Sequence, residues 1–254
     1  MDPWRSALLT HDQTNIWIRG YEIGALMERA SFPAVVFLLH RGRLPSPGEE
    51  RLLNTILIAS SDHNSGAPSV AAARIIASGN RQSLSAAVGG GLLAIGNEHG
   101  GAGANCMELI GRIAASARDT GISIEQAAAN AVAAARTAGK RLPGFGHRKH
   151  TTDPRVAVMF RMAREAGIAG DGVAVITALE VALAAAVKPL PTNVDGALAA
   201  LLYDMGFPPT AGMLLFMVGR VAGLTAEVAE EHAREKPMRV KIPVVYDGEP
   251  PREF

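Results

Sequence analysis

Apolar residues recur at helical spacing along most of the chain. One clear stripe, at positions i, i+1, i+4 and i+5, consists of Leu52, Leu53, Ile56 and Leu57. The polar residues Arg51 and Asn54 beside it are expected to face water. Because such a stripe gives a helix one apolar face, the pattern predicts helices that bury these faces against one another. The predicted fold class is all-α.

Two further helices are marked by their ends and their composition. Ser123 and Gln126 have capping-box spacing, and the run Ala127 to Ala138 is rich in alanine, the best helix former. Thr210 is expected to cap a long helix that continues to Val221. Three glycines on that helix suggest a close approach to a neighbouring helix: Gly212, Gly219 and Gly223. Because glycine costs about 1 kcal/mol relative to alanine inside a helix, packing must offset this cost.

Alternation typical of β-strands is almost absent. The one candidate is the segment Arg239 to Tyr246, in which every second residue is apolar. Pro243 lies within it and cannot donate a backbone hydrogen bond, so an edge strand or an extended arm is expected. Breaks between helices are predicted at Arg41 to Gly48, Ser60 to Pro68, Asn97 to Asn105, Lys140 to Pro154 and Lys188 to Gly196.

The composition is that of an ordinary folded protein, with 48% apolar and 19% charged residues. A chain of 254 residues can bury a large core, as one domain or as a main body with a small lobe. The net charge of +1 gives no overall field that would attract nucleic acid or an anionic membrane, so neither is expected as a partner. An anionic ligand would be held by a few local basic residues.

The single cysteine, Cys106, excludes an intramolecular disulfide and a cysteine-based zinc site, and it fits a reducing compartment. The first residues lack the basic end and apolar run of a secretory signal. The two most apolar stretches, Val173 to Val187 and Ala211 to Ala226, are shorter than the roughly 20 residues that span a bilayer. They are interpreted as buried helices, and a cytoplasmic protein is expected.

Candidate catalytic side chains lie at the predicted breaks. Four of the seven histidines do so: His63, His99, His147 and His150. Asp195 lies at another break, within Asn193-Val194-Asp195-Gly196. Loops and helix ends are where titratable side chains and backbone N–H groups meet ligands. Each of these residues could equally be a helix cap, a turn residue or part of a solvated loop.

Other kinds of site find little support. His-Glu-x-x-His and paired histidines at helical spacing are absent, so a zinc site is not expected. The Gly-x-Ser-x-Gly elbow of a serine hydrolase is also absent. Gly89-Gly90-Gly91 has no preceding strand, so it is not interpreted as a dinucleotide-binding loop.

Several segments occur in one order along the chain and together resemble a known family. They are Ile18-Arg19-Gly20-Tyr21-Glu22-Ile23, Ser61-Asp62-His63, Glu98-His99-Gly100-Gly101-Ala102, Gly144-Phe145-Gly146-His147-Arg148, Thr152-Asp153-Pro154-Arg155, Asn193-Val194-Asp195, Gly219-Arg220-Val221-Ala222-Gly223 and Pro237-Met238-Arg239. These segments resemble the citrate synthase superfamily from about Trp17 to Gly248. The resemblance implies one unit over residues 1–254, with a large helical body, a small lobe within about residues 105–190 and an extended C-terminal tail.

The resemblance also implies roles for individual residues. The catalytic residues would be His99, His147 and Asp195. The substrate-binding residues would be His63, Arg155, Arg220 and Arg239, the last reaching a partner's site. The turn that lies along the CoA chain would consist of Gly144, Phe145 and Gly146. No metal and no tightly bound cofactor are implied, a coenzyme A thioester is the substrate, and a homodimer or higher even oligomer is expected.

The implied chemistry joins or cleaves a carbon–carbon bond next to a thioester. Asp195 would be the base that forms the enol of acetyl-CoA, and His99 would donate a hydrogen bond to the enolate oxygen. In the cleavage of citryl-CoA, His147 would take the proton of the tertiary hydroxyl group. Asp195 would then return a proton to carbon.

Within the superfamily, the sequence is most similar to citryl-CoA lyases and the lyase module of ATP-citrate lyase. The segment Gly91 to Gly96 carries this similarity, as does Gly196, which stands where synthases have an aromatic residue. Gly66 and Ala67 replace an asparagine that synthases usually keep, and the stretch between His147 and Arg155 is one residue short, which leaves the placement of Arg155 open. The predicted function is reversible cleavage of citryl-CoA to acetyl-CoA and oxaloacetate.

Three alternatives stay open. The chain could be a citrate or 2-methylcitrate synthase, which condenses an acyl-CoA with oxaloacetate. It could be a non-catalytic acyl-CoA-binding protein, although the presence of His99, His147 and Asp195 argues against this. It could also be a helical interaction protein whose histidines are scattered without a common role.

Overall fold

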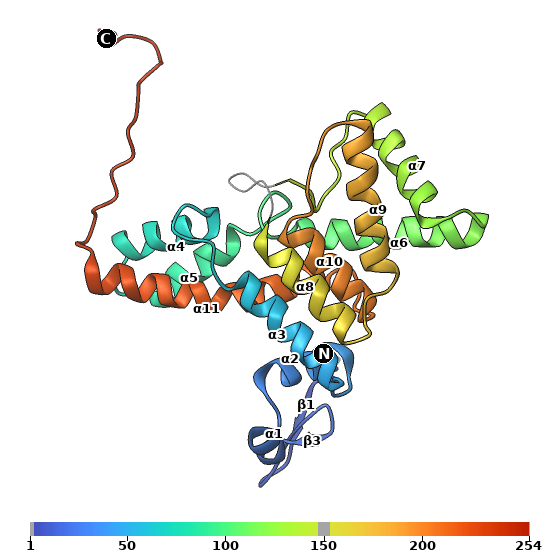
Figure 1. Ribbon diagram of the computed structural model, residues 1–254. Helices are drawn as coiled ribbons and strands as arrows, with labels where there is room; N and C mark the ends of the chain where they lie inside the picture. The colour runs from blue at the N-terminus through green and yellow to red at the C-terminus, as the bar shows by residue number, and fades with distance from the viewer. Residues whose placement is uncertain (1–2, 147–152, 254) are drawn as a thin grey trace.

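A computed structural model describes residues 3–146 and 153–253 of the protein. Over these residues the chain forms eleven helices and a small sheet, which confirms the all-α prediction (Figure 1). The strands are β1 (Leu9–His11), β2 (Ile16–Ile18) and β3 (Tyr21–Glu22). The helices are α1 (Ile23–Arg29), α2 (Phe32–Arg41), α3 (Pro47–Ser61), α4 (Pro68–Gly79), α5 (Leu84–Leu93), α6 (Ala102–Thr120), α7 (Ile124–Thr137), α8 (Pro154–Glu165), α9 (Asp171–Ala186), α10 (Val194–Asp204) and α11 (Ala211–Arg234).

The three strands form an N-terminal sheet that the alternation pattern did not predict. β2 pairs antiparallel with both β1 and β3, with Leu9 opposite Ile18 and Trp17 opposite Glu22. The strands have three, three and two residues, so each is too short to produce a visible alternation. Figure 1 shows this sheet with α1 at one edge of the molecule, away from α4 and α7.

The C-terminal tail was expected to form either an edge strand or an extended arm, and it does not form the edge strand. The described residues from Arg239 to Tyr246 contain no strand, because no other segment pairs with their backbone. They are extended, and Figure 1 shows the tail leading away from the end of α11. The segment is therefore an extended arm.

The helix ends follow from the sequence at most of the predicted breaks. Ser46 and Glu49 form a complete capping box at the start of α3. Ser123 caps α7 by accepting a hydrogen bond from the Gln126 backbone N–H at 3.2 Å. Thr210 precedes α11, but its side chain makes no capping hydrogen bond, which corrects the prediction. Its own backbone is already helical, so it lacks the extended conformation typical of a capping residue.

The core is built around α10. Val194 and the residues from Gly196 to Leu202 are buried, and α10 packs against α6, α8 and α9. The predicted stripe on α3 is buried as well, whereas Arg51 and Asn54 are exposed. Asp195 therefore lies at the first turn of the most central helix, on a rigid support.

The glycines of α11 make the predicted close approaches. A Cβ atom on Gly219 would lie 2.7 Å from the carbonyl oxygen of Leu57, and one on Gly223 would lie 2.0 Å from that of Ser61. No larger residue fits at either position without moving α3. These contacts bring Arg220, between the two glycines, against the C-terminal end of α3.

Within the described residues, α11 is the one helix long and apolar enough to cross a membrane by length and composition. It has 24 residues, so it is longer than the apolar stretch that predicted it. Half of its most apolar window is buried inside the protein, and it packs against α3, α4 and α5. Arg220, in its middle, is buried and hydrogen-bonded. These contacts are those of a core helix.

Candidate active site

Side chains from several segments meet where helices begin or end. Asp195 lies in the first turn of α10, and Arg155 lies in the first turn of α8. His99 precedes α6, and Arg220 lies in the middle of α11. The C-terminal end of α3 joins them, because two of its carbonyl oxygens accept hydrogen bonds from the two arginines, each at 3.0 Å.

His99 is connected to Arg220 through Ser69, a buried residue in the first turn of α4. The Nε2 atom of His99 lies 2.9 Å from the hydroxyl oxygen of Ser69 and 3.3 Å from its backbone nitrogen. The NH1 group of Arg220 donates to the same hydroxyl oxygen at 2.9 Å. A single serine thus holds the imidazole and the guanidinium group together.

This connection determines where the His99 proton lies. A guanidinium group can only donate, so it uses one lone pair of the Ser69 oxygen, and the hydroxyl hydrogen can point at Nε2. The backbone N–H of Ser69 also points at Nε2. Nε2 is therefore the acceptor, and a neutral His99 carries its proton on Nδ1. Such an N–H group is a suitable donor to a developing enolate oxygen.

Arg220 provides a buried positive charge, with 2% of its surface exposed. Burial lowers the pKa of its guanidinium group, while Asp62 and Asp195 favour the charged form. An arginine with a lowered pKa still keeps its charge at neutral pH. The guanidinium carbon lies 4.9 Å from the ring centroid of Phe216, and the same ring meets His99 edge-on at 6.4 Å between centroids. Phe216 is thus an apolar wall beside both groups.

Asp195 has the electrostatic surroundings of an acid–base group. Burial raises the pKa of its carboxyl group above the ordinary value, and the nearby charge of Asp153 acts in the same direction. Arg155 and Arg220 oppose this change by favouring the carboxylate. A raised pKa brings the carboxyl group closer to neutral pH, where it can both release and accept a proton.

Asp153 positions Arg155 and the start of α10 together. Its two carboxylate oxygens accept hydrogen bonds from Nε and NH2 of Arg155 at 2.9 and 2.7 Å. One of these oxygens also accepts the backbone N–H of Val194 at 3.1 Å. The two-point pairing is the strong form of an arginine–carboxylate contact. The structure therefore places Arg155 beside Asp195, although the sequence left its position open.

The turn Gly144–Gly146 lies against the start of α10. Gly144 has φ of +90°, a conformation that favours glycine. The N–H of Gly146 donates to the carbonyl oxygen of Pro191 at 2.8 Å, and the N–H of Asn193 donates to that of Gly144 at 3.0 Å. A Cβ atom on Gly196 would lie 2.4 Å from the carbonyl oxygen of Gly144. An aromatic side chain therefore cannot replace Gly196, the residue after Asp195, while the backbones of Gly144 and Gly196 stay packed against each other.

Of the other two histidines predicted for the site, His63 and His147, the structure describes only His63. His63 lies in the loop between α3 and α4, near Asp62, and is half-buried. Asp62 is the group that most favours the charged form of Arg220, so this loop borders the arginine. His147, together with His150, lies outside the described residues.

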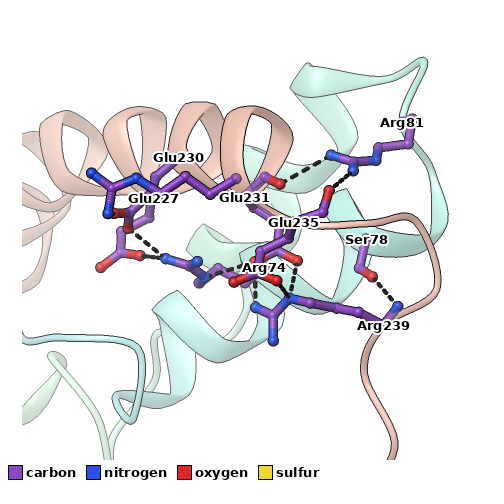
Figure 2. Close-up of polar contacts among 9 residues, drawn as sticks. Arg74, Ser78, Arg81, Glu227, Glu230, Glu231, Glu235 and Arg239 are labelled. Carbon is purple, nitrogen blue, oxygen red and sulfur yellow. Dashed lines mark hydrogen bonds and ion pairs between the residues drawn. The ribbon is translucent and has the colours of Figure 1, made fainter.

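Arg239 lies in a charged cluster at the C-terminal end of α11 (Figure 2). The buried carboxylate of Glu231 accepts hydrogen bonds from Nε of Arg239 at 2.7 Å and from Nε of Arg74 at 2.9 Å. The backbone N–H of Arg239 donates to Ser78 at 3.2 Å, which fixes the point where the tail leaves the body. Glu231 follows Arg220 by eleven helix positions, or about 16 Å. The structure therefore does not bring Arg239 to Asp195 within one chain.

Three residues of the site were not proposed as site residues from the sequence: Ser69, Asp153 and Phe216. Asp153 carries a recognisable signal, because it caps α8 directly before Pro154. Ser69 and Phe216 lie within helices, and only tertiary contacts bring them to His99. Among the described residues, no group of three or more His, Cys, Asp or Glu side chains is arranged to hold a metal ion.

The family model for the citrate synthase C-terminal domain matches residues 45–241. Citrate synthase 1 of Mycobacterium tuberculosis is 28% identical over 218 residues, which cover 82% of this chain and 49% of that protein. The citrate/2-methylcitrate synthase of Bacillus subtilis is 28% identical over 220 residues, which cover 85% of this chain and 56% of that protein. The chain thus spans about half the length of these curated relatives.

Solved structures add a relative of matching length. The citryl-CoA lyase of Hydrogenobacter thermophilus superposes with a TM-score of 0.90 and 34% identity, over 99% of this chain and 97% of that one. The ATP citrate lyase of Methanosaeta concilii, solved with (3S)-citryl-CoA, has a TM-score of 0.78 and 20% identity, over 98% of this chain and 42% of that one, and shows likeness of fold alone. With a family model over most of its length, this chain belongs to the citrate synthase family.

Proposed function

We propose that the protein is a citryl-CoA lyase, which reversibly cleaves citryl-CoA to acetyl-CoA and oxaloacetate. The observation that carries this proposal is the site itself, in which Asp195, with its raised carboxyl pKa, and His99, with Nε2 facing Ser69, accompany the buried Arg220. The likeness to a citryl-CoA lyase over nearly the whole length of both chains supports the choice of reaction.

The proposed cleavage moves one proton at each end of the broken bond. His147 accepts the proton of the tertiary hydroxyl group, and that carbon becomes the ketone of oxaloacetate as the carbon–carbon bond breaks. The bonding electrons pass into the enolate of the thioester, whose oxygen accepts a hydrogen bond from Nδ1–H of His99. The protonated carboxyl group of Asp195 then gives its proton to the enolate carbon, which forms acetyl-CoA.

The arginines have donors for the carboxylates of oxaloacetate. Arg220 has five N–H groups, and two of them donate to Ser60 and Ser69 within the described residues. The others can hold a substrate carboxylate, with burial strengthening the interaction. Arg155 is pinned by Asp153 and contributes a second positive charge near the same place.

A pocket beside the Gly144–Gly146 turn supports the use of a CoA thioester. It has a volume of about 510 Å³, and Phe145 and Gly146 line it. Its basic residues are Arg136, Lys140, Arg141 and Lys188. CoA carries phosphate groups, and four cations around one pocket fit such an anion. The pocket borders the turn that the family resemblance assigns to CoA.

The decisive experiment is to identify every product. We expect the pure protein to convert citryl-CoA to acetyl-CoA and oxaloacetate, as measured by mass spectrometry. With acetyl-CoA and oxaloacetate, we expect little free thiol, because Gly196 is packed against Gly144 and supplies no aromatic wall that would help to close a pocket around a hydrolytic water. Robust thiol release with stoichiometric citrate would instead make the protein a citrate synthase. Binding of CoA without any turnover would make it a non-catalytic acyl-CoA-binding protein.

We further propose that the protein is a homodimer. Val244 and Val245 in the tail are 85% and 88% exposed, and Leu93 at the end of α5 is 87% exposed. A partner subunit would cover such apolar side chains, and the anchored Arg239 would reach its site from the base of the tail. Light scattering at micromolar concentration should give twice the 26.6 kDa mass of one chain. A monomer under these conditions would contradict the proposal.

A further inference from the structure

The segment before Asp195 and the Gly144–Gly146 turn are paired along their backbones. Besides the two hydrogen bonds that join Gly146 to Pro191 and Asn193 to Gly144, Phe145 and Thr192 form a β-bridge. Residues 144–146 and 191–193 therefore form one short two-stranded unit. One of its strands borders the basic pocket, and the other continues directly into α10.

The side chain of Asn193 joins the two strands of this unit a second time. Its Nδ2 group donates to the carbonyl oxygen of Gly146 at 2.9 Å. Its Oδ1 atom accepts the backbone N–H groups of Asp195 and Gly196 at 3.0 and 3.2 Å. Because the amide group is planar and bonded at both ends, a displacement of the Gly146 carbonyl is passed on to the backbone of Asp195.

The surroundings of Asn193 leave few other ways for this unit to move. Glu180 on α9 accepts hydrogen bonds from the backbone N–H of Thr192 at 2.9 Å and from its hydroxyl group. Asp153 accepts the N–H of Val194. The residues on both sides of Asn193 are thus anchored to other helices, and its side chain adds, beside the backbone pairing, a direct link from the turn to the first turn of α10.

We propose that Asn193 is a positioning residue that couples occupation of the Gly144–Gly146 turn by a CoA thioester to the alignment of Asp195. This inference rests on the proposed function, because it takes CoA as the ligand of the turn. In the proposed arrangement Asn193 touches neither the reacting atoms nor the thioester. It acts through the backbone of Asp195.

Three variants separate the two tasks of this side chain. Asn193→Ser keeps a neutral capping oxygen at the start of α10 but cannot reach the Gly146 carbonyl, whereas Asn193→Ala loses both contacts. Asn54→Ser, on the exposed face of α3, is the matched control. We expect Asn193→Ser to keep the melting temperature within a few degrees and to lower kcat by about 10- to 100-fold, the scale of a misplaced catalytic group. Its affinity for oxaloacetate should stay unchanged in calorimetry.

A second measurement reports the coupling without turnover. In wild type, titration with CoA should shift the backbone amide NMR signals of Asp195 and Gly196, and in Asn193→Ser these shifts should fall to less than half. Wild-type shifts and wild-type kcat in Asn193→Ser would overturn the proposal and leave Asn193 a helix cap only. If wild type shows the CoA-dependent shifts but does not cleave citryl-CoA, the proposed function fails while the coupling stands. If CoA does not shift the two amides in wild type, the coupling itself is refuted.

Discussion

Asp195→Asn is expected to keep the fold and to lower turnover of citryl-CoA by about 10²–10⁴, the usual range for losing a general acid or base. The asparagine amide has nearly the same shape as the carboxyl group, and the backbone of residue 195 stays capped by Asn193. It cannot, however, give a proton to the enolate carbon. Steady-state kinetics will measure the loss, with Asp119→Asn on the exposed side of α6 as the matched control. Near-normal turnover of the variant would remove Asp195 from the mechanism.

The pH dependence gives Asp195 a second signature. Cleavage needs one proton on Asp195 and none on His147, and condensation needs the opposite arrangement of the same single proton. Below the pKa of Asp195 the carboxylate that acts as the base in condensation is protonated, so activity in that direction should fall. Because burial raises this pKa, the fall should begin above the ordinary carboxyl value of 3.8. The residual condensation activity of Asp195→Asn should lack this acidic limb, because the variant has no carboxylate to protonate.

The helices of this protein were predictable because their signals are local. The stripe on α3 and the glycines of α11 predict burial and close approach by themselves, and both are present. Segments with few residues or with purely tertiary partners were not predictable. The N-terminal sheet has strands too short to be recognised, and the capping role given to Thr210 fails because its backbone is already helical.

The same distinction applies to the site. The motifs around His99 and Asp195 mark loops at helix ends, and the structure places both there. Ser69 sits 30 residues from His99 and 151 from Arg220 in the chain, so its contact with both could not be inferred from spacing. The contact between Glu231 and Arg239 could not be predicted from the sequence either, because it depends on where the tail leaves α11.

The connection through Ser69 has a consequence for how the site keeps its charges apart. Arg220 carries the charge that holds a carboxylate, while His99 in its neutral form donates from Nδ1. A serine hydroxyl group serves both, because its oxygen accepts from the guanidinium group and its hydrogen points at the imidazole. A proton on Nε2 would instead face the backbone N–H of Ser69, which points at the same atom.

His99→Ala should therefore lower kcat for citryl-CoA by about 10²–10³, the cost of removing one donor to a developing oxyanion. The affinity for oxaloacetate should change little, because Arg220 remains in place. Ser69→Ala keeps the imidazole and the backbone N–H that points at Nε2, so its loss should be smaller, up to about tenfold, as for one hydrogen bond. His11→Ala, on the exposed strand β1, should have no effect. Single-turnover kinetics and calorimetry with oxaloacetate will separate the two readouts. If His99→Ala weakened oxaloacetate binding but left the single-turnover rate unchanged, His99 would be a binding residue and its role at the enolate oxygen would be refuted.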